Sequence, residues 1–451
     1  MRKRISAFFS VLAAIVLLTV PASAASSGST LKIICADAGQ VIFTPPGSTQ
    51  YAYRYGPAIL IDGDRIDIWA SAPPLVSNGV RYGNDSIEYI RSTDGGKTWT
   101  EWKTVLYPTL NSEDQWSTCD PGAFKYGDYY YVGYTGSPEF RTNPDKEKQV
   151  NNLFIARAKN PEGPYEKWNG NGWGGDPYAI TRYSGDGVGC SMPSFTVKGD
   201  TLYMYYVDQT HPDQDWNSEG NISVSTFSLK DPNWPGNELS NKMCENKPEE
   251  VRYCPDIDKF IGFQLKGGWD YDSYVEIYES TDGVNFTKTS SFRNNFPHYA
   301  HNIGISGNNL GQLDLSIQNY IGTAYTPTGV EAWWGHWHTQ LIPLYIREEQ
   351  PSSTTPSQPS GSTDSSSQKP TTSSVGSTDG KSSETEVSEP QNSNIESTVS
   401  DNKDKDKEVN NKTEQQEETS YLWLYIVIGA VVVLAGAGTA VYFLVIKKKH
   451  V

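Results

Sequence analysis

The sequence predicts an all-β fold, a five-bladed β-propeller, from two observations. Between Ala58 and Ile346, apolar and polar residues alternate in many short stretches, and none of these has the periodicity of a helix. A unit made of a proline, a short apolar strand, a turn and an aromatic strand also recurs. Its prolines lie 62 to 72 residues apart, which suits one four-stranded blade with long loops. They are Pro57, Pro121, Pro193 and Pro255, and His301–Ile317 is a looser fifth copy.

A secretory signal peptide is predicted for residues 1–24. The basic residues Arg2–Arg4 precede an apolar run, Ile5–Val20, and a stretch of small residues that ends at Ala24. We expect cleavage after Ala24, with the following domain exported.

Residues 30–347 are the predicted propeller domain. Propellers commonly close by adding a strand from one terminus to the last blade, and we expect Leu31–Ala36 or Val41–Thr44 to pair with Gln340–Ile346. The strands expected in the first blade are Ala58–Asp62, Arg65–Ala70, Ser86–Ser92 and Thr98–Leu106.

A predicted membrane anchor follows the propeller. Residues 348–420 are rich in Ser, Thr and Pro and then in charged residues, which predicts a disordered stalk. Residues 421–446 are apolar and long enough to span a bilayer, and residues 447–451 include three lysines that favour the cytoplasm. The sequence therefore predicts a single-pass type I protein of the cell membrane, with a monomeric propeller outside.

Charge and cysteine content exclude some classes of partner. The net charge of −16 argues against nucleic acid. The five cysteines are an odd number, so they do not form a complete disulfide scaffold, and they include no Cys-x-x-Cys element of a zinc site.

Two turns carry Asp-box motifs. Ser92–Trp99 is a complete Ser-x-Asp-x-Gly-x-x-Trp motif, and Ser280–Phe286 is a shorter version with phenylalanine in the aromatic position. They resemble the Asp-boxes of sialidases and other glycan-active propellers, which lie on outer hairpins away from the active site. We expect both to be structural, since Asp and Gly stabilise turns and the aromatic side chain fills the blade.

Asp120 is the strongest candidate for a catalytic or sugar-binding acid. The inner strands of a propeller line its channel, and we expect the residue before each repeated proline to lie at the channel mouth. Those residues are Gly56, Asp120, Met192 and Cys254, of which only Asp120 is a carboxylate. The alternative is an aspartate that caps the turn at the strand entry.

The stretch Ala156–Trp168 resembles a segment of five-bladed glycoside hydrolases, the arabinanase, xylosidase and fructosidase group. The resemblance implies hydrolysis of O-glycosyl bonds by a pair of carboxylates with a third aspartate beside them. Only Asp120 matches that pattern here, so the second acid must come from elsewhere, and Glu250 is the catalytic partner that we assign. The weaker candidates are Glu249, Glu139, Asp186, Asp208 and Glu219.

Two arginines favour an acidic sugar instead. Arg54-Tyr55 and Arg252-Tyr253 stand at the same offset before Pro57 and Pro255, so we expect both guanidinium groups, with both tyrosines, at the channel mouth. Two planar guanidinium groups can each donate paired hydrogen bonds to a carboxylate ligand. The first segment also resembles the Tyr-Arg-Ile-Pro segment of sialidases. The alternative is that these arginines form salt bridges between blades.

A metal ligand and a sugar-stacking residue complete the predicted site. The glycosidase resemblance implies an axial histidine near a bound calcium ion, and His301 is the matching residue. Trp333, in a cluster of three tryptophans that ends at Trp337, is the predicted sugar platform, although the cluster could equally wedge between blades.

The sequence thus predicts a cell-surface glycosidase-like propeller that hydrolyses or binds extracellular glycans. The alternatives are a sialidase-like hydrolase of acidic sugars and a non-catalytic glycan-binding module or adhesin. A hydrolase requires a second carboxylate about 5–10 Å from Asp120, whereas a binding module requires only a polar and aromatic lining.

Overall fold

A computed structural model describes residues 29–47, 52–143, 146–182, 188–210, 220–328 and 335–349, and in these ranges the regular secondary structure is β-strand. The all-β prediction is confirmed. Within these ranges no helix is long and apolar enough to cross a membrane. The predicted signal peptide, membrane span and cytoplasmic tail, and the stalk from residue 350 on, lie outside the described residues.

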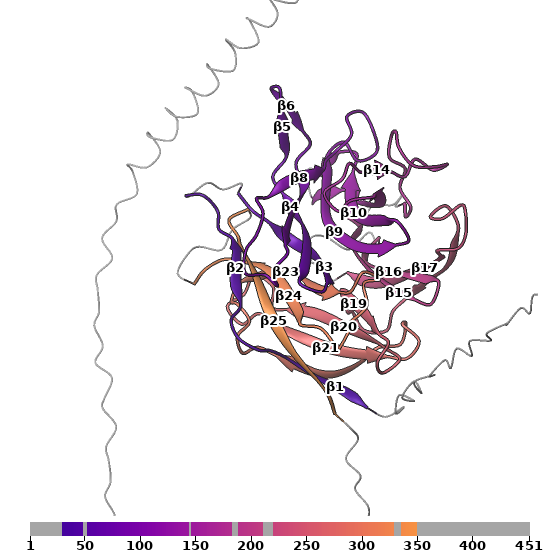
Figure 1. The fold of residues 1–451 in the computed structure, drawn as a ribbon. Coiled ribbons are helices and arrows are strands. Elements are labelled where there is room, and N and C mark those ends of the chain that lie inside the picture. The colour runs from indigo at the N-terminus through magenta and orange to yellow at the C-terminus, as the bar shows by residue number, and fades with distance from the viewer. Residues whose placement is uncertain are drawn as a thin grey trace, which may run out of the picture. The chain divides into compact units, whose positions relative to one another are not determined.

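Five antiparallel sheets follow one another along the chain, and a short parallel pairing of β23 with β3 joins the first and the fifth into one nine-stranded sheet (Figure 1). The first is β3 (Tyr55–Asp62), β4 (Arg65–Ala72), β7 (Ser86–Ser92) and β8 (Lys103–Leu106). The second is β9 (Ser117–Tyr126), β10 (Tyr129–Ser137), β13 (Asn152–Ala158) and β14 (Glu166–Lys167). The third is β15 (Gly189–Lys198), β16 (Thr201–Gln209), β17 (Asn221–Ser228) and β18 (Glu238–Met243). The fourth is β19 (Glu250–Cys254), β20 (Lys259–Lys266), β21 (Tyr274–Ser280) and β22 (Thr287–Phe292).

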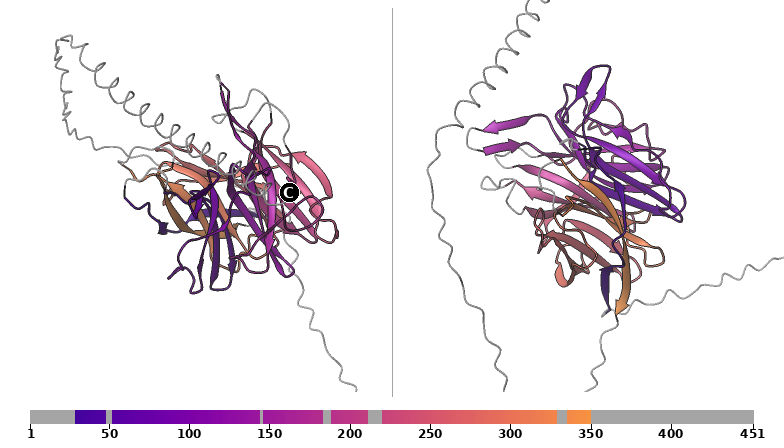
Figure 2. Two further views of the ribbon diagram at one scale, coloured as in Figure 1. Left: turned by 90° about the horizontal axis from the view of Figure 1, so that it is seen from above. Right: turned by 90° about the vertical axis from the view of Figure 1, so that its left-hand side faces the viewer.

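The fifth sheet combines both ends of the domain. It contains β23 (Ala300–Gly307), β24 (Asn319–Tyr325) and β25 (His338–Glu349), and its outer edge is formed by β1 (Thr30–Cys35) and β2 (Gln40–Phe43). Both N-terminal strands pair with β25, with Ile34 opposite Tyr345 and Gln40 opposite Leu341. The indigo strand β1 lies beside the end of the orange strand β25 in Figure 2 (right). The expected closure by an N-terminal strand is therefore observed, and it uses both predicted segments.

The five inner strands form a closed ring. β23 pairs in parallel with β3, and β3 lies beside β9. β9 approaches β15 so closely that a Cβ on Gly122 would lie 2.0 Å from the carbonyl oxygen of Pro193. The Tyr253 amide of β19 donates to Thr196 of β15, and Arg252 of β19 donates to the Ile305 carbonyl of β23. This cyclic order is the arrangement of a five-bladed propeller.

The core lies between neighbouring sheets. Trp69 of β4 packs with Val132 and Phe154 of the second sheet, and Phe124 of the second sheet packs with Phe195 of the third. The inner strands β3 and β15 are buried along almost their whole length because a sheet covers each side, which is why small, apolar and short polar residues predominate in them.

The Ser-x-Asp turns are held by local hydrogen bonds. Asp94 accepts from the amide and hydroxyl of Thr98, which lowers its pKa to about 2, and Asp282 accepts from the amides of Val284 and Asn285. Phe286 is buried beside the second turn. The first turn occupies the start of the predicted fourth strand, so β8 begins only at Lys103.

Two short hairpins extend the first and second sheets. They are β5 (Leu75–Ser77) with β6 (Val80–Tyr82), and β11 (Phe140–Asn143) with β12 (Lys146–Gln149). All five cysteines are buried as free thiols.

Candidate functional site

Backbone corners at one end of the ring bring the candidate residues together. Gly56, Asp120, Met192 and Asn302 lie at register shifts near the starts of β3, β9, β15 and β23, and all have a positive φ of 48° to 57°. A Cβ on Gly56 would lie 3.6 Å from Asp120 Oδ1 and 3.5 Å from Asn302 Nδ2. Three sheets therefore meet at Asp120.

The fourth sheet does not follow this pattern. Pro255 comes after the last residue of β19, and Cys254 pairs with Lys259 beside the hairpin turn. Tyr253 and Cys254 thus lie at the opposite end of the ring from Asp120. The prediction that each repeated proline marks the same end is right for three copies and wrong for the fourth, where Glu250 starts the strand.

Asp120 has a partly buried carboxyl group with several polar neighbours. Asn302 Nδ2 donates to its Oδ1 at 3.3 Å, and its backbone amide donates to Ser71 Oγ at 2.7 Å. Burial and the nearby charge of Asp85 raise the pKa of Asp120 to about 6, and hydrogen bonds from Thr135 and Cys119 limit the rise. This carboxyl can therefore hold or release a proton near pH 6.

Asp85, which the sequence analysis missed, lies just behind Asp120. Its carboxylate accepts hydrogen bonds from the Tyr53 hydroxyl at 2.5 Å, from Ser117 Oγ at 2.8 Å and from Asn84 Nδ2 at 3.2 Å. Burial raises the pKa of Asp85, and these three donors oppose that effect. A single Asp before a third strand has no repeat to identify it, so only the fold reveals this position.

Aromatic rings border Asp120 on the side of the fifth sheet. The His301 ring stacks on Trp337 with centroids 4.3 Å apart, and Tyr55 lies 5.5 Å from His301. Burial raises the pKa of Tyr55, and the charges of Asp85, Cys119 and Asp120 add to this effect. Tyr55 is thus near Asp120, as predicted, but as a buried ring.

Trp269 gives this cluster its exposed face. Its ring lies 4.5 Å from that of His301 and 5.3 Å from that of Trp337, and 37% of the residue is exposed. Its φ of 71° is unusual for a bulky residue, and such backbone strain is common at functional sites. Trp337 is fully buried and acts as a wedge, while the predicted platform residue Trp333 lies outside the described residues.

The described contacts of His301 are with aromatic rings. The ring packs against Tyr55, Trp269 and Trp337, whereas calcium takes six to eight oxygen ligands, so these contacts give the predicted calcium site no support. Burial lowers the pKa of His301 to about 3, so the imidazole is neutral at pH 7. In the part of the chain that the structure describes, no three His, Cys, Asp or Glu side chains could hold a metal ion together.

Arg54 forms an ion pair away from Asp120. Its Nη2 lies 2.5 Å from Glu88 Oε2, and its guanidinium lies 4.6 Å above the Phe43 ring and 5.6 Å above the Trp102 ring. Burial lowers the pKa of Arg54, and the Glu88 carboxylate opposes this. Arg54 therefore fixes the first sheet to the closing strand β2.

Arg252 joins three inner strands. Its Nε and Nη2 donate to the Ile305 carbonyl, its Nη1 donates to Ser194 Oγ, and Nη2 lies 2.8 Å from Glu250 Oε2. Burial raises the pKa of Glu250, and the positive charge of Arg252 is the main effect that lowers it. These contacts make the pair structural.

The predicted convergence of Asp120, Arg54 and Arg252 is therefore wrong, because both arginines are committed to other partners. Glu250 is bound within the ring rather than offered as a second acid. Tyr253 is not a substrate contact either, since its hydroxyl donates to Asp258 at 2.7 Å near the far turn. Both arginines form ion pairs within their own sheets, Arg54 with Glu88 and Arg252 with Glu250, and their contacts to neighbouring sheets are hydrogen bonds and a ring contact. The alternative of salt bridges between blades is therefore not observed as such, but the ion pairs still remove the basis for a sialidase-like carboxylate clamp.

Comparisons with known proteins give only distant structural matches. No protein-family model matches this chain, and neither does any curated protein. An α-L-arabinofuranosidase from Podospora anserina, solved with cellotriose, is 11% identical with a TM-score of 0.44, covering 71% of this chain and 98% of that one.

Two further solved structures are similar to the same extent. A family 117 glycoside hydrolase from Zobellia galactanivorans is 14% identical with a TM-score of 0.44, covering 71% of this chain and 91% of the other. An α-L-arabinofuranosidase from Lactobacillus brevis is 13% identical with a TM-score of 0.45, covering 66% and 92%. At these values the similarity carries no argument about the reaction or the substrate.

Proposed function

We propose that the domain recognises an extracellular glycan at the end of the ring where Asp120 lies. The observation that carries this proposal is a group of polar and aromatic side chains at this end of the ring. The Asn302 amide donates to the Asp120 carboxyl, and the neighbouring His301 contacts the exposed ring of Trp269. Ligand sites typically combine an aromatic surface with a few placed polar groups. An acid and an amide can accept from and donate to sugar hydroxyls, while the indole face covers the apolar face of a pyranose or furanose.

Glycan binding fits this end of the ring better than hydrolysis. A glycosidase requires two carboxyl groups about 5–10 Å apart. The residues that correspond to Asp120 in the first, third and fifth sheets are Gly56, Met192 and Asn302, which are not acids, and Glu250 at the start of β19 is paired with Arg252. The weaker candidates Asp186 and Glu219 lie outside the described residues. Asp85 is buried and accepts three hydrogen bonds, so it is placed to orient its neighbours and not to attack a sugar.

Hydrolysis of O-glycosyl bonds is the second candidate, favoured by the pKa of Asp120. A carboxyl with a pKa of about 6 can donate a proton to a leaving group in mildly acidic medium. A cell-surface location is part of the proposal and rests on the predicted signal peptide and membrane span.

A glycan screen tests both candidates. The purified full chain would be titrated with arabinan, xylan, fructan and sialylated oligosaccharides, with parallel assays for released reducing sugar. We expect at least one glycan to bind, and Trp269→Ala to weaken it by about tenfold or more. Tyr345→Ala removes another exposed ring, on β25, and should leave affinity unchanged.

The outcomes separate the proposals. Equal affinities of wild type and Trp269→Ala for the glycan would show that the glycan does not bind at Trp269. Sugar release that disappears in Asp120→Asn would establish the hydrolase, and binding without release would establish the binding module.

A further inference from the structure

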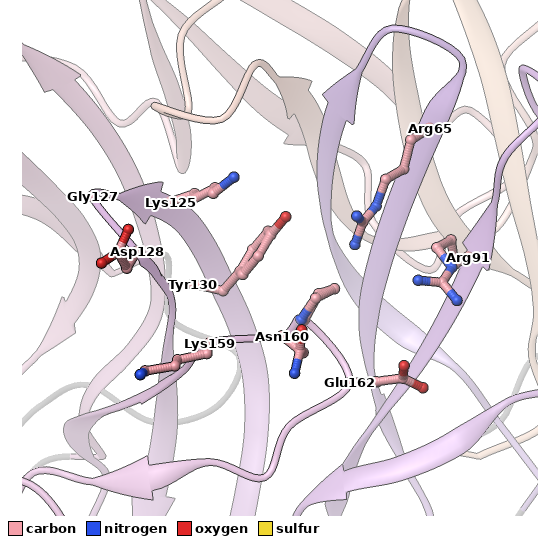
Figure 3. Close-up of a pocket in the computed structure, with 10 residues that line it drawn as sticks. Arg65, Arg91, Lys125, Gly127, Asp128, Tyr130, Lys159, Asn160 and Glu162 are labelled. Atoms are coloured by element: carbon pink, nitrogen blue, oxygen red, sulfur yellow. The ribbon is translucent and has the colours of Figure 1, made fainter.

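A polar cavity lies between the first and second sheets. Its volume is about 280 Å³, and Figure 3 shows its charged lining. Four of these side chains are cationic and two are acidic: Arg65, Arg91, Lys125, Lys159, Asp128 and Glu162. On a chain with a net charge of −16, this is a local excess of positive charge.

This cavity is distinct from the Asp120 site. Asp120 is the fourth residue of β9 and Lys125 is the ninth, so a rise of about 3.3 Å per residue separates them by about 16 Å along the strand. Arg65 opens β4 directly after the hairpin turn of the first sheet, and Asp128 lies in the corresponding turn of the second. The cavity therefore opens at the opposite end of the inner strands.

Tyr130 holds two of the cations close together. Its ring lies 5.8 Å from the Arg65 guanidinium and 5.1 Å from Lys125 Nζ (Figure 3). The negative faces of an aromatic ring attract cations and so reduce the cost of placing two of them near each other.

Several donors in this cavity lack an acceptor. Arg65 pairs with Asp67 at 2.8 Å through Nε, but its Nη2 is buried and makes no hydrogen bond within the described ranges. Nε of Arg91 is also buried and makes no hydrogen bond within the described ranges. Buried donors are almost always satisfied in native proteins, so these nitrogens point to an acceptor that the described residues do not supply.

We propose that this cavity binds a tetrahedral oxyanion, a phosphate or sulfate group, either free or as an ester on an extracellular glycan. Guanidinium groups bind such oxygens through paired, charge-assisted hydrogen bonds, and the lysines add unspecific attraction. The four cations and two acids of the lining leave an excess of positive charge that favours an anion, although the Arg65–Asp67 ion pair offsets part of it. This inference does not depend on the function proposed for the Asp120 site.

Calorimetric titration of the full chain tests the proposal. The probes are inorganic phosphate, inorganic sulfate, glucose 6-phosphate and glucose 6-sulfate, each at an ionic strength matched with chloride so that screening is constant. We expect saturable binding of at least one probe. Tighter binding of the sugar esters would identify an ester as the source, and equal affinities would identify the free ion.

Variants locate the binding. The double variant Arg91→Gln/Lys125→Gln should weaken binding by about tenfold or more, since each lost charge-assisted hydrogen bond is worth about that factor. Lys230→Gln/Lys242→Gln removes the same charge from two exposed positions of the third sheet, the turn after β17 and the outer strand β18, and should have no effect. The exposed Lys159→Gln variant provides a second test that does not threaten folding.

No saturable binding beyond the chloride control would overturn the proposal. So would equal loss of affinity in the cavity variants and in the third-sheet control, because that result would reflect net charge alone.

Discussion

At the scale of single residues, Asp120 and His301 differ in how burial changes their charge. Burial raises the pKa of Asp120 from 3.8 to about 6, and it lowers the pKa of His301 from 6.5 to about 3. Both shifts favour neutral side chains. The end of the ring is therefore less charged at pH 5 than its composition suggests, which suits a neutral polar ligand.

Asp120→Asn should change the pH dependence of stability. The folded chain binds the Asp120 proton more tightly than the unfolded chain does, so this contribution is present below about pH 4 and is lost as the pH rises through about 6. Asparagine keeps an oxygen for Asn302 and does not titrate. We expect the melting temperature of the variant, relative to wild type, to rise from pH 4 to pH 7.

The same variant should lose glycan affinity at pH 7 by about ten- to a hundredfold while remaining folded. His301 contributes with the opposite sign over the same pH range, but it is present in both proteins and cancels in the difference. A melting-temperature difference that does not vary with pH would contradict the shifted pKa. Unchanged affinity together with a lower melting temperature would leave Asp120 only a structural role.

Glu250→Gln should lower stability and leave glycan affinity unchanged. Removing one partner of a buried ion pair typically costs about 3–5 kcal/mol, because Arg252 keeps its charge without compensation. Chemical denaturation measures the loss, and Glu238→Gln, on the exposed strand β18, is the matched control. A stable Glu250→Gln variant that has lost sugar hydrolysis would restore Glu250 as a catalytic acid.

At the scale of elements, the N-terminal strand β1 completes the fifth sheet by pairing with β25, and only one face of β1 is buried. Leu31, Ile33 and Cys35 are buried against the fourth and fifth sheets, and the residues between them point outward. Because side chains alternate along a strand, neighbouring isoleucines have different environments. Ile33 is 1% exposed and Ile34 is 38% exposed.

Ile33→Ala should therefore destabilise the domain by about 2–5 kcal/mol, since it leaves a cavity in the closing sheet. Ile34→Ala removes the same atoms from the outer face and should cost about 0.5 kcal/mol or less. Denaturant midpoints measure both values. Equal effects of the two substitutions would show that β1 does not pack as described.

At the scale of the whole molecule, the propeller completes its fold within residues 30–349. The last strand, β25, pairs with β1 and β2, so the two ends of the domain hold each other. A chain that stops at residue 349 and lacks residues 1–24 should thus fold as a soluble monomer. Its melting temperature should equal that of a chain that retains the predicted stalk to residue 420, as differential scanning calorimetry can check. A marked fall on truncation would make the stalk part of the fold.

The sequence by itself determined the features that depend on local pattern. Alternating residues specify strands, the prolines at 57, 121 and 193 mark the starts of inner strands, and the apolar positions of Leu31–Ala36 fit a closing strand. Asp120 could be singled out because three copies of one unit align and only one carries an acid.

Only the tertiary structure decided which side chains meet. Pro255 repeats the local motif, yet it follows β19, so Arg252 and Tyr253 lie elsewhere than the repeat predicts. Asp85, Trp269 and the cavity around Tyr130 belong to loops and to boundaries between sheets. Their neighbours come from segments far apart in the chain, and such contacts are set by how whole sheets pack, which no short stretch of sequence records.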